Sequence, residues 1–142
     1  MEQLKERVDT CKRALSTLSE ILSLPVSVIV RDASIQRFEY SFESSWKLLK
    51  GYLYKVEGLI CNSPKECFRE GFKVGVLSVE ETETSLVMTD DRNLTSHTYI
   101  EPIAEAIYRK LPSYLAVMQS LLENIQGRIE HTIAESEGSG DR

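Results

Sequence analysis

Residues 31–53 have the sequence RDASIQRFEYSFESSWKLLKGYL, and this stretch decides the fold class. Its large apolar residues recur at steps of three and four, which places them on one face of an α-helix. They are Ile35, Phe38, Phe42, Trp46, Leu49 and Leu53. Asp32 is the predicted cap of this helix, because aspartate accepts hydrogen bonds from the first free backbone amides. We favour core packing for Phe42 and Trp46, and stacking on a nucleobase is the alternative.

The segment before this helix carries a second apolar stripe with the same spacing. It comprises Leu4, Val8, Cys11, Leu15, Leu18 and Leu22. This stripe predicts a helix of about six turns, and Leu24-Pro25 ends it. Val26, Val28 and Val30 alternate briefly, but the run is too short for a strand. We therefore predict a connection there.

Two helix start signals follow the quoted stretch. Ser63-Pro64-Lys65-Glu66 combines a serine cap, a proline at the first helical position and a glutamate that completes a capping box. Ser78-Val79-Glu80-Glu81 repeats the capping-box pattern. The first signal predicts a short helix and the second a more polar one. Their predicted apolar positions are Phe68, Phe72 and Val76 in the first, and Thr82, Leu86, Val87 and Leu94 in the second.

Pro102 begins the last and longest predicted helix, and Pro112 inside it is expected to kink or loosen it. Its apolar stripe is Ile103, Ile107, Leu111, Tyr114, Met118, Leu121, Leu122 and Ile125. The sequence thus predicts an all-α fold, an up-and-down bundle of about five helices with a four-helix-bundle core. Residues 1–130 are predicted to form a single domain, and 131–142 a disordered tail.

Charge and hydropathy argue against two classes of function, general nucleic-acid binding and membrane insertion. The chain has 142 residues, 17 basic against 22 acidic, and a net charge of -5. This balance disfavours bulk electrostatic capture of nucleic acid but leaves room for a local site. No apolar run approaches the ~20 residues of a membrane span. Because the first residues also lack the pattern of a secretory signal, we expect a cytoplasmic protein without membrane contact.

The cysteines and histidines predict no metal site and no cofactor. Cys11, Cys61 and Cys67 form no CxxC pattern, and an odd, sparse set predicts reduced thiols. Only two histidines, His97 and His131, are available as metal ligands. We assign no role to His131.

The densest polar segment is DDRNLTSHTY at residues 90–99. Asn93 and His97 are four residues apart and share a helical face, whereas Arg92 is about 140° away from His97 around the helix. Histidine exchanges protons at neutral pH, and arginine pairs with phosphate oxygens. Together, His97 and Arg92 would be able to cleave RNA without a metal. A dimer would supply the second histidine that such a reaction favours.

Simpler interpretations stand beside this one. A histidine near a helix C-terminus is often a surface cation, and Asp90-Asp91 is typical of a solvated charge cluster. Lys65, Arg69 and Lys73 are spaced by four and form one basic stripe. That stripe is predicted to hold RNA phosphates or to face an acidic partner, and a solvated helix face is the alternative.

Several segments resemble one known family. The run from Arg92 to His97 is similar to the R-x4-H motif of HEPN-domain proteins, and Tyr99 extends it to the R-x4-H-x-Y of HEPT toxins. Residues 31–40 with 46–47, and residues 63–73, resemble the second and third helices of the nucleotidyltransferase substrate-binding protein family. The resemblance spans roughly residues 4 to 125. Leu86 and Val87 depart from it, because an aromatic is expected there in many relatives.

The resemblance implies a homodimeric bundle that works with a minimal nucleotidyltransferase. One implied function is a metal-independent endoribonuclease toxin, with Arg92 and His97 catalytic and Asn93 supporting. The partner would then silence it by adding AMP to Tyr99. The alternative is a non-catalytic substrate-binding subunit of a two-component nucleotidyltransferase. RNA or a nucleotide is the expected substrate, and the polar fourth helix is the expected dimer surface.

Overall fold

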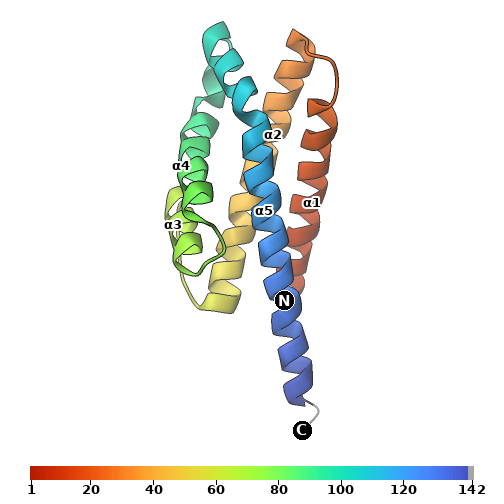
Figure 1. Ribbon diagram of the computed structural model, residues 1–142, viewed down its shortest axis with the longest axis vertical. Coiled ribbons are helices and arrows are strands. Elements are labelled where there is room, and N and C mark those ends of the chain that lie inside the picture. The colour runs from red at the N-terminus through yellow and green to blue at the C-terminus, as the bar shows by residue number, and fades with distance from the viewer. Residues whose placement is uncertain (141–142) are drawn as a thin grey trace.

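Helices alone make up the regular structure of residues 1–140, the part of the chain that the computed structural model describes; side chains are described through residue 138. In chain order they are α1 (Glu2–Leu22), α2 (Val28–Glu57), α3 (Pro64–Lys73), α4 (Val79–Leu94), the short 3-10 helix η1 (Thr95–His97) and α5 (Glu101–Gly140). The long helix α2 contacts all four other α-helices. The helices lie roughly along one axis, and the end of α5 projects beyond the others (Figure 1). The predicted all-α bundle is confirmed.

Helix α2 begins earlier than the sequence predicted. Ser27, not Asp32, is the cap, and its hydroxyl accepts from the Val30 amide at 3.0 Å. Val28 and Val30 therefore belong to the first turn of α2 rather than to a connection. Serine and aspartate cap helices about equally well, so the earlier of the two starts the helix. At the other end, Gly58 adopts φ 68°, the left-handed conformation that ends a helix, as expected for a loop glycine.

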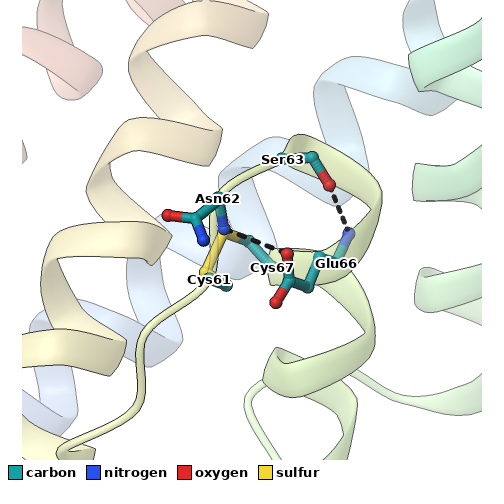
Figure 2. Close-up of a disulfide and its surroundings, with 5 residues drawn as sticks. All are labelled: Cys61, Asn62, Ser63, Glu66 and Cys67. Carbon is teal, nitrogen blue, oxygen red and sulfur yellow. Dashed lines mark hydrogen bonds between the residues drawn. A yellow bond between two sulfur atoms is a disulfide. The ribbon is translucent and has the colours of Figure 1, made fainter.

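The two start signals downstream lie where the sequence placed them. The Ser63 hydroxyl accepts from the Glu66 amide, but the Glu66 carboxylate accepts from the Asn62 amide rather than from that of Ser63. Ser78 and Glu81 form a complete capping box. Both hydrogen bonds of the first cap are drawn in Figure 2.

The predicted stripe of α4 is confirmed at Thr82 and wrong at its three apolar positions. Val87 and Leu94 are exposed, Leu86 is half-buried, and the buried face carries small polar side chains instead. The polar members of this face are Thr82, Ser85, Thr89 and Asp91, and Met88 is its one apolar member. The hydroxyls of its threonines and serine donate to carbonyls one turn earlier, at 2.7–2.8 Å. Because these groups are satisfied within their own helix and its cap, they can be buried without partners elsewhere.

The prediction of three reduced thiols is wrong for two of them. Cys61 and Cys67 form a disulfide with a Cα–Cα distance of 5.4 Å (Figure 2). Ser63 caps α3, so Cys67 lies at the start of that helix, and both cysteines are buried. Cys11 is a free, buried thiol, as predicted, and burial raises its pKa.

The predicted disordered tail is helical as far as the structure describes it. Helix α5 runs through Pro112 and continues to Gly140. His131 and Glu135 are four residues apart on it, and their side chains lie 3.1 Å apart. Such pairs support a solvent-exposed helix. Residues 141–142, the end of the predicted tail, lie outside the described residues.

A buried arginine joins the starts of α2 and α5. Arg31 donates to Glu101 at 2.6 and 3.2 Å, to Glu105 at 2.8 Å and to Asp32 at 3.0 Å. These bonds raise the pKa of Arg31 and lower that of Glu101. Glu101 follows Tyr99 by two residues, so this network holds one end of the motif turn in place.

Candidate active site

The R-x4-H-x-Y segment lies at the end of α4 and in the turn that leads to α5. Arg92 and Asn93 belong to the last turn of α4, His97 to η1, and Tyr99 to the turn before Glu101. The side chains of Asn93, His97 and Tyr99 are exposed, and that of Tyr99 is 77% exposed. Only the arginine is substantially covered by the protein.

Arg92 is held between two helices. Its Nη1 donates to the Thr95 hydroxyl at 2.9 Å, and Thr95 in turn donates to the Arg92 carbonyl at 2.7 Å. Across the gap to α2, Nη1 lies 3.5 Å from Glu39 Oε2 and Nε lies 3.5 Å from Glu43 Oε1. The buried Nε–H has no hydrogen-bond partner in the described residues. The guanidinium is thus oriented but not fully bonded. Its Nη2 makes no hydrogen bond or ion pair within the described residues, and this group, rather than the buried Nε, has donors left for an anion.

His97 pairs with the tyrosine of the motif. Its Nδ1 lies 3.4 Å from the Tyr99 hydroxyl, and the two rings meet edge to face with centroids 6.0 Å apart. Arg92 and His97 share no hydrogen bond within the described chain. The structure therefore brings together His97 with Tyr99, and Arg92 with Thr95, but does not join the two pairs. Asn93 contributes an exposed side chain beside them.

The acidic partners of Arg92 were missed from the sequence. Glu39 and Glu43 are four residues apart, so they share one face of α2. That spacing was visible in the sequence, but the helix that they face was not. Glu43 also accepts from Trp46 Nε1 at 3.1 Å and lies 3.8 Å from Lys47 Nζ. The Glu43 carboxylate thus contacts both Arg92 and the next turn of α2, where Trp46 and Lys47 lie.

The two aspartates before Arg92 have different surroundings. Asp90 is exposed and lies 2.7 Å from Lys65, which agrees with a solvated charge cluster. Asp91 is buried, accepts a hydrogen bond from the Tyr114 hydroxyl, and lies 2.6 Å from Lys110 Nζ. Burial, and then this bond to a carboxylate, raises the pKa of Tyr114. Asp91 therefore ties the end of α4 to α5 directly behind Arg92.

The predicted basic stripe lies on α3. Lys65 contacts Asp90 as described, and Lys73 lies 3.0 Å from Glu70. Arg69 is exposed. Two of the three cations therefore already have a carboxylate neighbour, and the stripe is separate from the Arg92 contacts.

Two kinds of feature are absent from the described part of the chain. No group of three or more His, Cys, Asp and Glu side chains gathers there in a metal-binding arrangement. None of its helices is both long and apolar enough to cross a bilayer.

Comparison with known proteins defines the class. The family of nucleotidyltransferase substrate binding protein like chains matches residues 6–127. The chain belongs to this family, as the resemblance of its second and third helical segments indicated. It is also 28% identical over 102 residues to the probable ribonuclease HepT of Haemophilus influenzae, covering 69% of this chain and 68% of that one.

Solved structures show the same fold. A Thermus thermophilus protein is 48% identical, with a TM-score of 0.79, and the match covers 81% of this chain and 98% of that one. A Haemophilus influenzae protein described as a substrate binding domain of a nucleotidyltransferase has a TM-score of 0.62 at 22% identity, covering 88% and 98%. The tri-AMPylated Shewanella oneidensis HEPN toxin, solved in complex with MNT antitoxin, has a TM-score of 0.72 at 13% identity, covering 87% and 96%. The last two matches bear on the fold alone.

Proposed function

We propose that this chain is the HEPT-type partner of a minimal nucleotidyltransferase and acts as a metal-independent endoribonuclease. The observation that carries the proposal is the incompletely bonded guanidinium of Arg92 in the same short segment as the exposed imidazole of His97. An exposed imidazole can exchange protons with a bound strand, and a guanidinium with free donors can bind its phosphate. The similarity to a probable ribonuclease HepT supports this assignment.

The reaction follows from these two groups. His97 takes the proton from a ribose 2′-hydroxyl, whose oxygen attacks the adjacent phosphorus. The bond from phosphorus to the 5′-oxygen breaks, the strand ends in a cyclic phosphate, and the leaving oxygen takes a proton. Arg92 stabilises the negative charge that develops on the phosphate oxygens. Asn93 supports the strand beside them.

One histidine serves this reaction poorly, because one proton is removed and another is supplied at a different atom. A homodimer would bring a second His97 to the same phosphate. The exposed apolar side chains of Val87, Leu94 and Ile100 beside the motif support this arrangement. Sedimentation at micromolar concentration tests it, and a monomer under those conditions would contradict a composite site.

Tyr99 is the proposed site of silencing by the nucleotidyltransferase. Its hydroxyl is exposed to a partner enzyme and lies 3.4 Å from His97 Nδ1. An AMP on this oxygen would place a negative charge beside the histidine, where it would repel the phosphates of RNA. The AMPylated HEPN toxin with its MNT antitoxin is a precedent in the same fold.

A non-catalytic substrate-binding subunit is the second candidate. Arg92 contacts two carboxylates and is not joined to His97, which suits a binding role as well as a catalytic one. The family description, nucleotidyltransferase substrate binding protein like, favours the same role.

Cleavage of labelled RNA in EDTA separates the two candidates. Intact mass first establishes that Tyr99 carries no AMP. We expect wild-type protein to cleave, His97→Ala to lose activity by about 10²–10⁴-fold, and His131→Ala, which removes the other exposed histidine, to match wild type. Absence of cleavage by unmodified wild type over several RNA substrates would instead favour the binding subunit.

A further inference from the structure

A second candidate site lies away from the motif, where the first turns of α1 meet the second half of α2. A cavity of about 670 Å³ opens there. Its wall carries four cationic side chains and one carboxylate, Glu2. The cations are Arg7, Lys47, Lys50 and Lys55. In a chain with a net charge of -5, this local excess of positive charge favours an anionic ligand.

Most of this positive charge is not neutralised by the protein. Within the described residues, Arg7, Lys50 and Lys55 have no carboxylate within 4 Å, whereas Lys47 lies 3.8 Å from Glu43. Glu2 is itself 3.6 Å from Lys5, outside the cavity. A phosphate group would supply the missing negative charge.

Two aromatic side chains stand among these cations. Trp46 is half-buried, and Lys50 Nζ lies 5.8 Å from the centroid of its ring. Tyr54 follows two turns later and is 65% exposed. Aromatic rings beside lysines are the combination with which proteins hold single-stranded nucleic acid, since bases stack on the rings while the cations meet the phosphates.

Gly51 lets α1 pack closely against α2 at the edge of the cavity. A Cβ atom at this position would lie 3.3 Å from Arg7 Cδ and 3.4 Å from Leu4 Cδ1. A larger side chain at this position would therefore press on Arg7 and Leu4 of α1. The glycine lets the two helices approach while a hollow remains beside them.

The cavity and the motif are linked through one residue. Glu43 lies 3.5 Å from Arg92 and accepts from Trp46, which lines the cavity. Seven residues of helix separate Glu43 from Lys50, a rise of about 10 Å. Glu43 therefore contacts one residue of each site, Arg92 of the motif and Trp46 of the cavity.

We propose that this cavity binds one nucleotide unit, a base with its phosphate, of a single-stranded RNA whose reacting phosphodiester lies at Arg92 and His97. The proposal rests on the proposed ribonuclease function. Tyr54 and Trp46 contact the base, and Lys50, Lys55 and Arg7 bind its phosphate. The cavity thereby anchors the strand at a fixed distance from the point of cleavage.

Fluorescence anisotropy with a labelled eight-nucleotide RNA tests the site. The protein carries His97→Ala so that the strand stays intact, and labelled AMP is the second probe. We expect Lys50→Glu and Tyr54→Ala each to weaken RNA binding by about tenfold. Lys12→Glu, the same charge change on the exposed face of α1, is the matched control and should alter binding less than about twofold. All three positions are exposed, and circular dichroism verifies that each variant is folded.

Each result bears on the site separately from the ribonuclease. Equal binding by all variants, or no binding of either probe, would overturn the cavity site even if wild-type protein cleaves RNA. Tight AMP binding that depends on Lys50 and Tyr54, without RNA binding, would assign the cavity to a free nucleotide and overturn the RNA proposal. Variant-dependent RNA binding without cleavage by wild type would support the cavity and contradict the ribonuclease.

Discussion

Arg31 and Arg92 each face two glutamates of a neighbouring helix, yet their surroundings differ. Arg31 is 3% exposed and makes four hydrogen bonds of 2.6–3.2 Å to Asp32, Glu101 and Glu105. The Arg92 side chain is 27% exposed. Its two carboxylate contacts are both 3.5 Å, and its buried Nε–H is unpartnered in the described residues.

The difference separates a structural arginine from one available to a ligand. Four short bonds use nearly all the donors of Arg31, so it joins α2 to α5 and has little capacity for anything else. Arg92 is positioned by Thr95 but only loosely paired, so an incoming phosphate can compete for its donors. Both residues are arginines, and only the number and length of their contacts distinguish their roles.

The largest expected effect is on activity at Arg92. Arg92→Ala should reduce RNA cleavage by about 10²–10³-fold, because it removes the group that stabilises charge on phosphate. Thermal unfolding should change little, since Glu39 and Glu43 are partly exposed and become hydrated. Arg13→Ala, which removes an exposed arginine of α1, is the control. A loss of cleavage that merely follows a loss of folded protein would contradict this role.

At Arg31 we expect the opposite outcome, a large loss of stability with activity retained by the folded protein. Arg31→Met should lower the melting temperature more than any other single change proposed here, because it removes four hydrogen bonds at the junction of α2 and α5. The fraction that remains folded should still cleave RNA. If Arg31→Met and Arg92→Ala changed stability equally, the contrast between the two arginines would be wrong.

A smaller effect on stability is expected for the hydrogen bond between Tyr114 and Asp91, the residue before Arg92. Tyr114→Phe removes the hydroxyl that donates to buried Asp91, and should lower the free energy of unfolding by about 1–3 kcal/mol. Denaturant titration measures the change. Tyr108→Phe on the same helix is the matched control, because the Tyr108 hydroxyl has no side-chain hydrogen bond in the described chain. Equal losses in both variants would show that Asp91 contributes nothing specific.

The smallest expected effect is on the pH dependence of stability at Glu101. Arg31 lowers the pKa of Glu101 below its ordinary value of 4.5. A carboxylate with a lowered folded-state pKa stabilises the protein above its unfolded pKa, and this contribution is lost as the pH falls through the folded value. Glu101→Gln should therefore lower the melting temperature at pH 7, and the difference from wild type should shrink below about pH 4.5. A difference independent of pH would remove the ion pair as its cause.

The fold was largely predictable because its signals are local. The stripe from Ile35 to Leu53 is buried as expected apart from Trp46, which is half-buried and lines the cavity. The caps at Ser63 and Ser78 lie where the sequence placed them. Two of the failures have a common cause: the start of α2 and the buried face of α4 depend on hydroxyl groups. A hydroxyl can face solvent, cap a helix or bond within its own helix, and hydrophobic periodicity does not distinguish these cases.

The site was predictable only in part. The residues Arg92, Asn93, His97 and Tyr99 were visible as a motif, and their catalytic and modification roles remain predictions. The contact between His97 and Tyr99 joins residues only two apart, so it follows from local structure. Which carboxylates would meet Arg92 did not follow from any spacing.

The sequence by itself determined where most of the helices lie, which apolar faces they bury and which short motif the chain carries, because each depends on residues within a few turns of one another. Tertiary structure alone decided three other features. These are the carboxylates around Arg92, the buried Asp91–Tyr114 bond and the basic cavity between α1 and α2. Each joins residues from different helices, and only the packing of those helices sets how closely their side chains approach.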